Sequence, residues 1–362
     1  MGSGHQISEK TSLRLGRPDI MRTEYNVQDA PIVAGAYAGR SAPADNKMRT
    51  LEEYQQMGYL LHAWDGITPT VITDVNGLIV AYLAGRPTNR AEWEKIMKGC
   101  KTAMETANRE LTLGNGNRRG PYRSITAGIS VGPGSTRPGT LAQKPYNEEP
   151  LQRLVNDINI QRAAHFASSC MAMLAPKMYQ EYFDGLDQVL ENDPSLRPLF
   201  PNSVFAATSW NFGPKACTVP HVDSLNRAVG WCSIFALGDF DPLHGGQIVL
   251  DPLRLIIVFP AGSTILIPSA IFRHGNTPIR EGETRMVMTQ FSSGGIYRMV
   301  EQGFKTLKEL RRDKQDDAQK FDSPTYKKER ESQQLNLFST VENLHADRVK
   351  CGVVRLLKGA QK

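Results

Sequence analysis

A histidine and an aspartate two residues apart, His221 and Asp223, are the pair in this 362-residue sequence that most directly suggests chemistry. They follow a stretch that is expected to form a strand. Side chains alternate between the two faces of extended chain, so both residues point to the same side. A neutral imidazole and a carboxylate on one face can both bind one metal ion. The pattern alone is common, so further residues are needed to define a site.

Two further residues, both later in the chain, complete such a site. His274 stands 51 residues after Asp223, and two histidines with one carboxylate form the facial triad of non-haem iron(II) oxygenases. Arg285 follows 11 residues after His274, where its guanidinium could hold the distal carboxylate of a dicarboxylic acid through two hydrogen bonds. The alternative for Arg285 is a surface salt bridge with Glu283. The set indicates an oxygenase that uses Fe(II), 2-oxoglutarate and O2.

Short runs of β-branched and aromatic residues must position these side chains. Six such runs are separated by turn residues, at 204–210, 230–237, 247–250, 255–259, 264–267 and 285–291. Helical patterns precede them at 91–111, 150–174 and 178–191, and Asn76-Gly77 predicts a hairpin between 71–74 and 78–83. Closely spaced short strands indicate a double-stranded β-helix, the jelly roll. The expected fold class is α+β, with a jelly-roll core flanked by helices.

Three segments are expected along the chain. Residues 1–50 are polar, with scattered glycine, proline and alanine, and predict a loosely structured N-terminal arm. Residues 51–304 form the oxygenase domain, with a helical and glycine-rich basic part at 51–200 and the jelly-roll core at 201–304. Residues 305–362 form a charged helical extension, whose mixed charges favour a solvated helical face over a nucleic-acid-binding arm.

The stretch 111–147 is unusual in composition. It holds seven glycines, four prolines and five basic residues, and it has no acidic residue. It is either a long connecting loop with a solvated basic edge or a segment that contacts an anion. In the second case Arg123, Arg137 and Lys144 are candidates for contacts with a DNA backbone.

Composition limits the class of protein. The sequence is 40% hydrophobic and 22% charged, with a net charge of +6 that fits a polyanionic partner without establishing one. No apolar run approaches the roughly 18 residues of a membrane span, and the N-terminus lacks the apolar stretch of a signal peptide. Five scattered cysteines without a paired motif argue against a disulfide framework and a cysteine zinc cluster. We expect a reducing compartment, no membrane partner and a monomer.

Several segments resemble the oxygenase core of the TET/JBP family of nucleic-acid-modifying iron/2-oxoglutarate dioxygenases, especially its fungal members. The segments that carry the resemblance are HVDSLN (221–226), GWCSIFALGDFDPLHGGQIVL (230–250), FPAGSTILIPSAIFRHGNTPI (259–279) and ETRMVMTQFSSGG (283–295). Weaker similarity upstream, in NRRGPYRSITAGISVG (117–132) and LAPKMYQEY (174–182), extends the resemblance over roughly residues 60–304.

The resemblance implies roles for individual residues. His221, Asp223 and His274 match the iron ligands, and Arg285 matches the arginine that anchors 2-oxoglutarate. Asn226 matches an asparagine that reads a flipped methylated cytosine, although it could instead cap the turn after the strand. Either Arg118 or Arg119 matches an upstream arginine near the co-substrate. The cysteine-rich zinc-binding segment of animal TET proteins is missing from this sequence, so the basic glycine-rich stretch would have to supply the DNA contacts.

The expected function is therefore that of a nuclear DNA dioxygenase. It would flip a methylated base out of double-stranded DNA and oxidise the methyl group, converting 5-methylcytosine to 5-hydroxymethylcytosine and further oxidised forms. One alternative is an N6-methyladenine demethylase that acts by the same chemistry. Others are a peptide or small-molecule hydroxylase on the same fold, and a non-catalytic DNA-binding module with a vestigial metal site.

Overall fold

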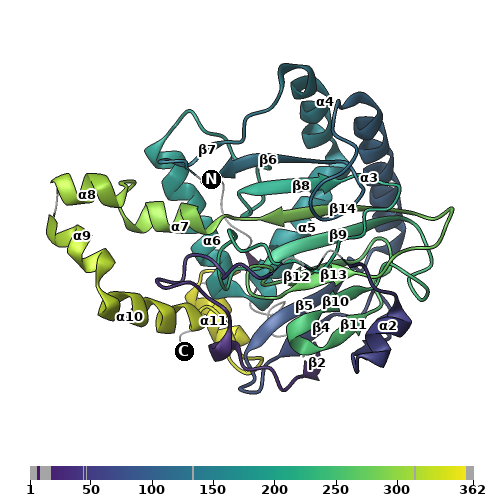
Figure 1. Cartoon of the computed structure of the whole chain (residues 1–362), viewed down its shortest axis with the longest axis horizontal. Helices are drawn as coiled ribbons and strands as arrows, with labels where there is room; N and C mark the ends of the chain where they lie inside the picture. Colours follow the sequence, from purple (N-terminus) through teal and green to yellow (C-terminus); the bar gives the residue numbers. More distant parts are fainter. Residues whose placement is uncertain are drawn as a thin grey trace.

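A nine-stranded sheet forms the centre of the molecule (Figure 1). The computed structural model describes residues 6–8 and 18–355, apart from positions 44, 46, 133 and 314. The strand order of the sheet is β2-β4-β5-β12-β9-β14-β8-β6-β7. In chain order its strands are β2 (Asp19–Arg22), β4 (Thr70–Thr73), β5 (Ile79–Gly85), β6 (Ser124–Ser130), β7 (Gly139–Thr140), β8 (Ala207–Asn211), β9 (Cys232–Asp239), β12 (Thr264–Ile267) and β14 (Thr284–Phe291).

A four-stranded sheet packs against one face of the large sheet. Its strands, in spatial order, are β13 (His274–Asn276), β10 (Ile248–Leu250), β11 (Leu255–Ile257) and β3 (Leu60–His62). One buried apolar cluster contains Ile234 of β9 together with Ile248 and Ile257 of the smaller sheet. The protein therefore has mixed helix and strand content, with two large sheets that enclose part of the core between them.

Helices cover the other face of the nine-stranded sheet. They are α3 (Arg90–Glu110), α4 (Pro145–Asn156), α5 (Ile158–Leu174) and α6 (Pro176–Asn192). Phe235 and Leu237 of β9 pack in a second buried cluster with residues of α3, while Ile234 lies on the opposite face of the same strand. Strand β9 is thus buried on both faces, which explains why its sequence is an almost unbroken apolar run.

Most elements that the sequence predicts are present with shifted ends. The expected helix at 150–174 is the main exception, because two helices, α4 and α5, occupy this region. The Asp157 side chain accepts hydrogen bonds from the backbone N–H groups of Asn159 and Ile160 and so begins a new helix. Pro150 lies inside α4, which starts at Pro145. Strands β3 and β13 were not predicted, since each forms by pairing with a strand elsewhere in the chain, β3 with β11 and β13 with β10.

The prediction of a loose arm over residues 1–50 is wrong for much of the segment. Strand β2 pairs in parallel with β4 at the edge of the large sheet, and Val27 and Ala36 are completely buried. A 3-10 helix, η1 (Val27–Asp29), and a short helix, α2 (Leu51–Gln56), follow β2. Backbone hydrogen bonds to β4 and a few buried side chains order a segment whose composition is polar. Positions 1–5, 9–17, 44 and 46, to which the prediction also applies, lie outside the described residues.

The stretch 111–147 is not a structureless loop. It contains β6, which pairs with β8 inside the nine-stranded sheet, and β7 at the sheet edge. Ala127 and Ile129 of β6 are buried. The glycine content concealed the strand, because glycine disfavours strands in isolation and here occupies positions where backbones approach closely. An alanine at Gly128 would place its Cβ 2.3 Å from the carbonyl oxygen of Ala206.

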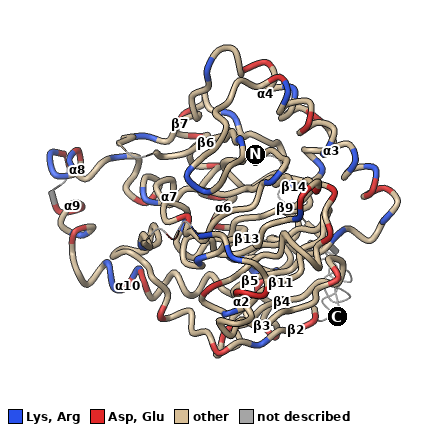
Figure 2. The backbone as a smooth tube through the Cα atoms, turned by 45° about the vertical axis from the view of Figure 1, so that its right-hand side comes forward, with Lys and Arg blue, Asp and Glu red and all other residues tan. Residues whose placement is uncertain are grey.

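The C-terminal extension is helical, as predicted, and the chain there leaves the body and returns to it (Figure 1). Helix α7 (Gly294–Glu301) precedes the extension. The helices of the extension are α8 (Leu307–Asp313), α9 (Gln315–Asp322), α10 (Pro324–Leu335) and α11 (Leu344–Lys350), and β15 (Val354–Arg355) follows them and pairs with β1 (Ile7–Ser8). Figure 2 shows basic and acidic residues side by side on α8 to α10. The prediction of a merely solvated face is wrong for α10, where Arg330 and Gln334 are buried against the body.

Two predictions from composition can be compared with the described part of the chain. All five cysteines are free thiols, in agreement with the absence of a disulfide pattern. No described helix combines the length and the apolar character that crossing a membrane requires.

Candidate metal centre and co-substrate pocket

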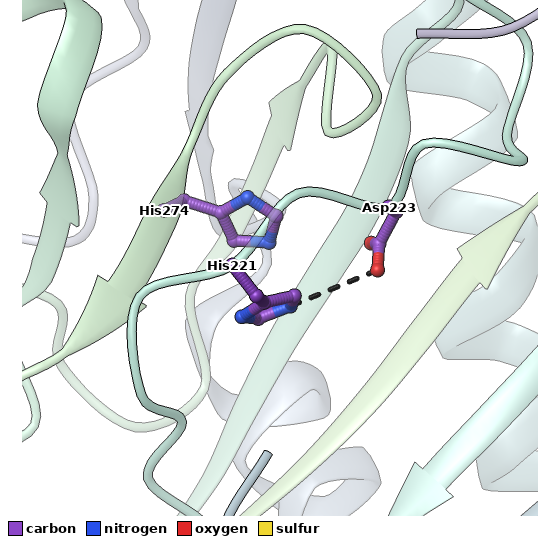
Figure 3. A group of neighbouring side chains, drawn as sticks. All are labelled: His221, Asp223 and His274. Atoms are coloured by element: carbon purple, nitrogen blue, oxygen red, sulfur yellow. Dashed lines mark ion pairs between the residues drawn. The ribbon is translucent and has the colours of Figure 1, made fainter. Parts of the chain in front are cut away.

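The structure brings His221, Asp223 and His274 together between the two sheets (Figure 3). One potential ligand atom from each residue lies within 4.8 Å of the others. His221 Nε2 is 3.7 Å from Asp223 Oδ1, the pair marked by the dashed line in Figure 3. His221 and His274 exchange two backbone hydrogen bonds of 2.9 Å, an antiparallel bridge that places their side chains next to each other. The three residues can therefore act as ligands to one metal ion.

Backbone carbonyls orient both imidazole rings in the same way. His221 Nδ1 lies 2.8 Å from the carbonyl oxygen of Val219, and His274 Nδ1 lies 2.8 Å from that of Phe272. A carbonyl oxygen only accepts hydrogen bonds, so Nδ1 carries the hydrogen and Nε2 keeps its lone pair. This is the arrangement of metal-binding histidines, whose second nitrogen is usually held by an acceptor. The sequence does not show this pair of carbonyls.

The local electrostatics keep the three residues in the forms that bind metal. Burial lowers the pKa of His221 to about 3, with a further contribution from His274 that outweighs the attraction of Asp223. Burial also lowers the pKa of His274. For Asp223 burial acts in the opposite direction, but the Arg119 guanidinium and the two histidines lower its pKa to about 2. At neutral pH the site holds two neutral imidazoles and one carboxylate.

Arg285 is buried on β14 with most of its hydrogen-bonding capacity unused. Its Nη1 donates to the carbonyl oxygen of Ala216 at 2.5 Å, whereas Nε and Nη2 have no partner among the described residues. The Arg285 Cζ lies 5.8 Å from the ring centroids of both Phe240 and Phe259. Burial lowers the pKa of Arg285. The alternative salt bridge with Glu283 is absent, because that carboxylate pairs with Arg280 at 2.8 Å and Arg285 points into the interior.

A cavity of about 90 Å³ joins Arg285 to the triad, and we call it the inner cavity. Alternate residues of β14 line it, starting with Arg285, Val287 and Thr289. In the register of the sheet Asn211 of β8 stands opposite Val287 and Ser209 stands opposite Thr289, so these two polar side chains share the cavity face. Neither residue was predicted, since the alternation of side chains in β8 indicates which residues share a face but not which strand pairs with it.

A larger, open cleft of about 970 Å³ lies outside the inner cavity, and we call it the outer cleft. Arg119 and His221 line both spaces, so the outer cleft leads to the metal centre. Its walls come from three separate parts of the chain: residues 41–43, residues 115–121, and residues 219–222 with Ser224. No Asp or Glu is among the described residues that line it. The contribution of 41–43 was not predicted, because the segment carries no residue pattern that points to a site.

The other residues to which the family resemblance assigns roles, Asn226, Arg118 and Arg119, line one or both of these spaces. Asn226 lines the inner cavity, and its Nδ2 donates to Ser269 Oγ at 3.1 Å. Its backbone N–H donates to the backbone carbonyl oxygen of Asp223 at 2.8 Å. It therefore closes a turn with its backbone while its side chain faces the cavity. Arg119 forms an ion pair with Asp223, and Arg118 is exposed in the wall of the outer cleft.

The other basic residues of 111–147 lie away from both spaces. Arg123 Nη1 donates to the carbonyl oxygen of Asn108 at 2.5 Å, and Nη2 to that of Leu111, so it satisfies the C-terminal end of α3. Arg137 forms a two-point ion pair with Glu309 of α8, at 2.8 and 3.1 Å. Lys144 is exposed just before α4. None of the three lines the inner cavity or the outer cleft.

Comparisons with known proteins give structural likenesses only. No protein-family model matches the sequence, and no curated protein matches it. The structure of NgTET1 in complex with 5mC DNA is similar at a TM-score of 0.44 and 14% identity, over 67% of this chain and 86% of that one. A 2OG-Fe(II) oxygenase-family oxidoreductase from Burkholderia pseudomallei is similar at a TM-score of 0.32 and 17% identity, over 53% of this chain and 78% of that one. The structure of OsALKBH1 is similar at a TM-score of 0.31 and 15% identity, over 58% of this chain and 97% of that one.

Likenesses at TM-scores this low carry no argument about the chemistry of this chain. The function of this chain is inferred instead from its own metal centre, Arg285 and the two connected spaces.

Proposed function

We propose that this protein is an Fe(II)- and 2-oxoglutarate-dependent dioxygenase built on a double-stranded β-helix core. The observation that carries the proposal is the unpaired guanidinium of Arg285 in the cavity that also contains the triad. A buried cation with two free donors is costly unless an anion satisfies it. A carboxylate at one end of a dicarboxylic acid would accept both hydrogen bonds, while the other end of the acid reaches the metal.

The side chains at the centre fit this assignment. His221, Asp223 and His274 would hold the iron on one side, and three positions would remain for 2-oxoglutarate and O2. When bound, iron(II) and 2-oxoglutarate supply oxidation of an unactivated C–H bond, with O2 consumed and 2-oxoglutarate converted to succinate and CO2. The chain itself binds the distal carboxylate through Arg285. Ile234, Ile248 and Val287 form part of the apolar lining of the inner cavity.

The substrate that we propose is a methylated base in double-stranded DNA. An outer cleft with two arginines and no acidic residue among its described lining suits a phosphate backbone. A base must leave the duplex to reach the metal, and the amide of Asn226 at the cavity wall can bond to its Watson–Crick edge. We propose 5-methylcytosine, oxidised to 5-hydroxymethylcytosine and beyond, and a nuclear location follows from such a substrate. N6-methyladenine would undergo the same chemistry, and a peptide or small molecule is the remaining alternative.

The test is mass spectrometry of nucleosides from duplex DNA incubated with the protein, Fe(II), ascorbate and 2-oxoglutarate. Separate duplexes carry 5-methylcytosine or N6-methyladenine, and succinate is measured in parallel. His221→Ala is the control for adventitious iron chemistry. We expect oxidised 5-methylcytosine with the unsubstituted protein and none with the variant. Succinate without any oxidised base would retain the dioxygenase and reject both of these methylated bases as its substrates, and the absence of succinate would reject the dioxygenase as well.

A further inference from the structure

Residues 35–43 lie between the metal centre and the C-terminal helix α10, and we call them the cleft strap. The end of the strap, Ser41 to Pro43, forms one wall of the outer cleft. The strap touches neither the inner cavity nor Arg285. It is therefore placed to contact a substrate in the outer cleft without taking part in the binding of iron or 2-oxoglutarate.

One side of the strap is attached to the loop that carries Asp223. The Gly39 N–H donates to the carbonyl oxygen of Ser224 at 2.9 Å, and the hydroxyls of Ser41 and Ser224 are 3.4 Å apart. A Cβ at position 39 would stand 1.9 Å from the carbonyl oxygen of Ala270, so only glycine allows this approach. These contacts hold this wall of the outer cleft against the loop that carries the metal ligand Asp223.

The other side of the strap is held by the C-terminal extension. The guanidinium of Arg330 on α10 stacks on the Tyr37 ring, with Cζ 3.8 Å from the centroid. Arg330 Nη1 lies 3.1 Å from Glu301 Oε2, and the Tyr37 hydroxyl donates to the same oxygen at 2.7 Å. Next to this pair, the Gly35 N–H donates to Glu331 Oε1 at 3.2 Å.

A buried arginine joins these contacts to the metal loop. Arg227, four residues after Asp223, forms a two-point ion pair with Glu181 of α6 at 2.7 and 3.0 Å. Its Nη1 donates to the carbonyl oxygen of Ala36 at 2.7 Å, and its Nη2 donates to Gln334 of α10. Arg227 therefore links the strap, through the carbonyl oxygen of Ala36, to both α6 and α10.

We propose that Arg330 is a positioning residue for substrate recognition. Through its stack on Tyr37 it holds the cleft strap as a wall of the outer cleft, so that helix α10 governs the engagement of the substrate while the metal centre acts independently of it. The nature of the substrate rests on the proposed function. The positioning of the strap does not, and the two are tested by separate measurements.

The first measurement is hydrogen–deuterium exchange in the full-length protein with Arg330→Ala. Lys328→Ala is the matched control, since it removes one positive charge from the exposed side of the same helix. We expect exchange at the amides of 35–40 to accelerate by about 10-fold or more in Arg330→Ala only, with peptides of β9 and β14 unchanged. Unchanged exchange at 35–40 in a folded variant overturns the proposal. If Arg330→Ala does not fold, Glu331→Ala removes the acceptor of the Gly35 amide and gives the same test at smaller amplitude.

The second measurement separates recognition from chemistry. For Arg330→Ala we expect the KM for a methylated duplex to rise about 10-fold, while kcat and the succinate formed without DNA stay within about twofold. Arg330→Lys keeps a cation near Tyr37 and should recover part of the KM. If KM rises and both kcat and DNA-free succinate formation fall by the same factor, the positioning role is overturned and the variant is destabilised as a whole. If the unsubstituted protein forms succinate but oxidises no base, the proposed substrate fails, and the exchange experiment still decides the role of Arg330.

Discussion

The inner cavity and the outer cleft adjoin at Arg119 and His221, yet they are built in different ways. Strands and the loops next to them supply the inner cavity, and the hydrogen-bond register of β8 with β14 places its polar side chains in rows. Loops from three distant segments supply the outer cleft. A site built on strands tolerates little movement, whereas a site built on loops depends on whatever holds the loops. Under the proposed function, the iron chemistry and the recognition of the base by Asn226 would belong to the inner cavity, and the binding of the DNA backbone would belong to the outer cleft.

The largest effect is expected at the metal centre. His221→Ala should lower succinate formation by more than about 100-fold, because even residues that only orient a metal ligand are worth about 10–100-fold in affinity or activity. Isothermal titration with Mn²⁺ as a redox-inert probe should show the same loss of binding. Retained turnover and retained Mn²⁺ binding together would show that the metal lies elsewhere.

Arg285→Met is the second test of the inner cavity. The KM for 2-oxoglutarate should rise roughly 100-fold, since two hydrogen bonds to a charged carboxylate are lost at about 1.5 kcal/mol or more each. The thermal midpoint should stay the same or rise, because the residue removed is a buried cation with two unsatisfied donors. A large drop in the midpoint with an unchanged KM would make Arg285 a structural residue and remove the main support for the proposed function.

Asn226→Ala tests the recognition of the base in the inner cavity. Base oxidation should fall by about 10-fold, while succinate formed without DNA should change little, because the amide faces the cavity but binds no metal. Ser269→Ala removes the partner of that amide and should produce a smaller change in the same direction. Equal losses of oxidised base and of succinate would assign Asn226 to the turn alone.

The smallest effect is expected in the outer cleft. Arg118→Ala should weaken duplex binding a few-fold and reduce the slope of log affinity against log salt by about one, as for the loss of one phosphate contact. Arg137→Ala is the matched control, since Arg137 is engaged by Glu309 outside the cleft. Fluorescence anisotropy at several salt concentrations measures both variants. An equal change in slope for the two would indicate a diffuse electrostatic effect and no defined contact in the cleft.

The pattern of apolar residues in the sequence predicted those strands and helices that depend mainly on residues close together in the chain. The apolar runs of β9, β12 and β14 and the helical period of α3 are visible in the sequence, because each depends on a short repeat of side chains. The order of β2 and the burial of Ala36 were not visible, because they come from contacts with β4 and Arg227. Strand β13 was missed although it carries His274, since its three residues pair only in the context of β10.

The site divides along the same line. The sequence by itself determined which groups can bind metal and carboxylate, because donor chemistry belongs to the residue and the spacing of His221 and Asp223 is local. Only the tertiary structure decided that His274 joins them and that Arg285 is left without an anionic partner. It also decided that residues 41–43 line the outer cleft and that the cleft strap is held by contacts across 183 residues to Ser224 and across 296 residues to Glu331. Packing between distant segments sets such contacts, and no local pattern encodes them.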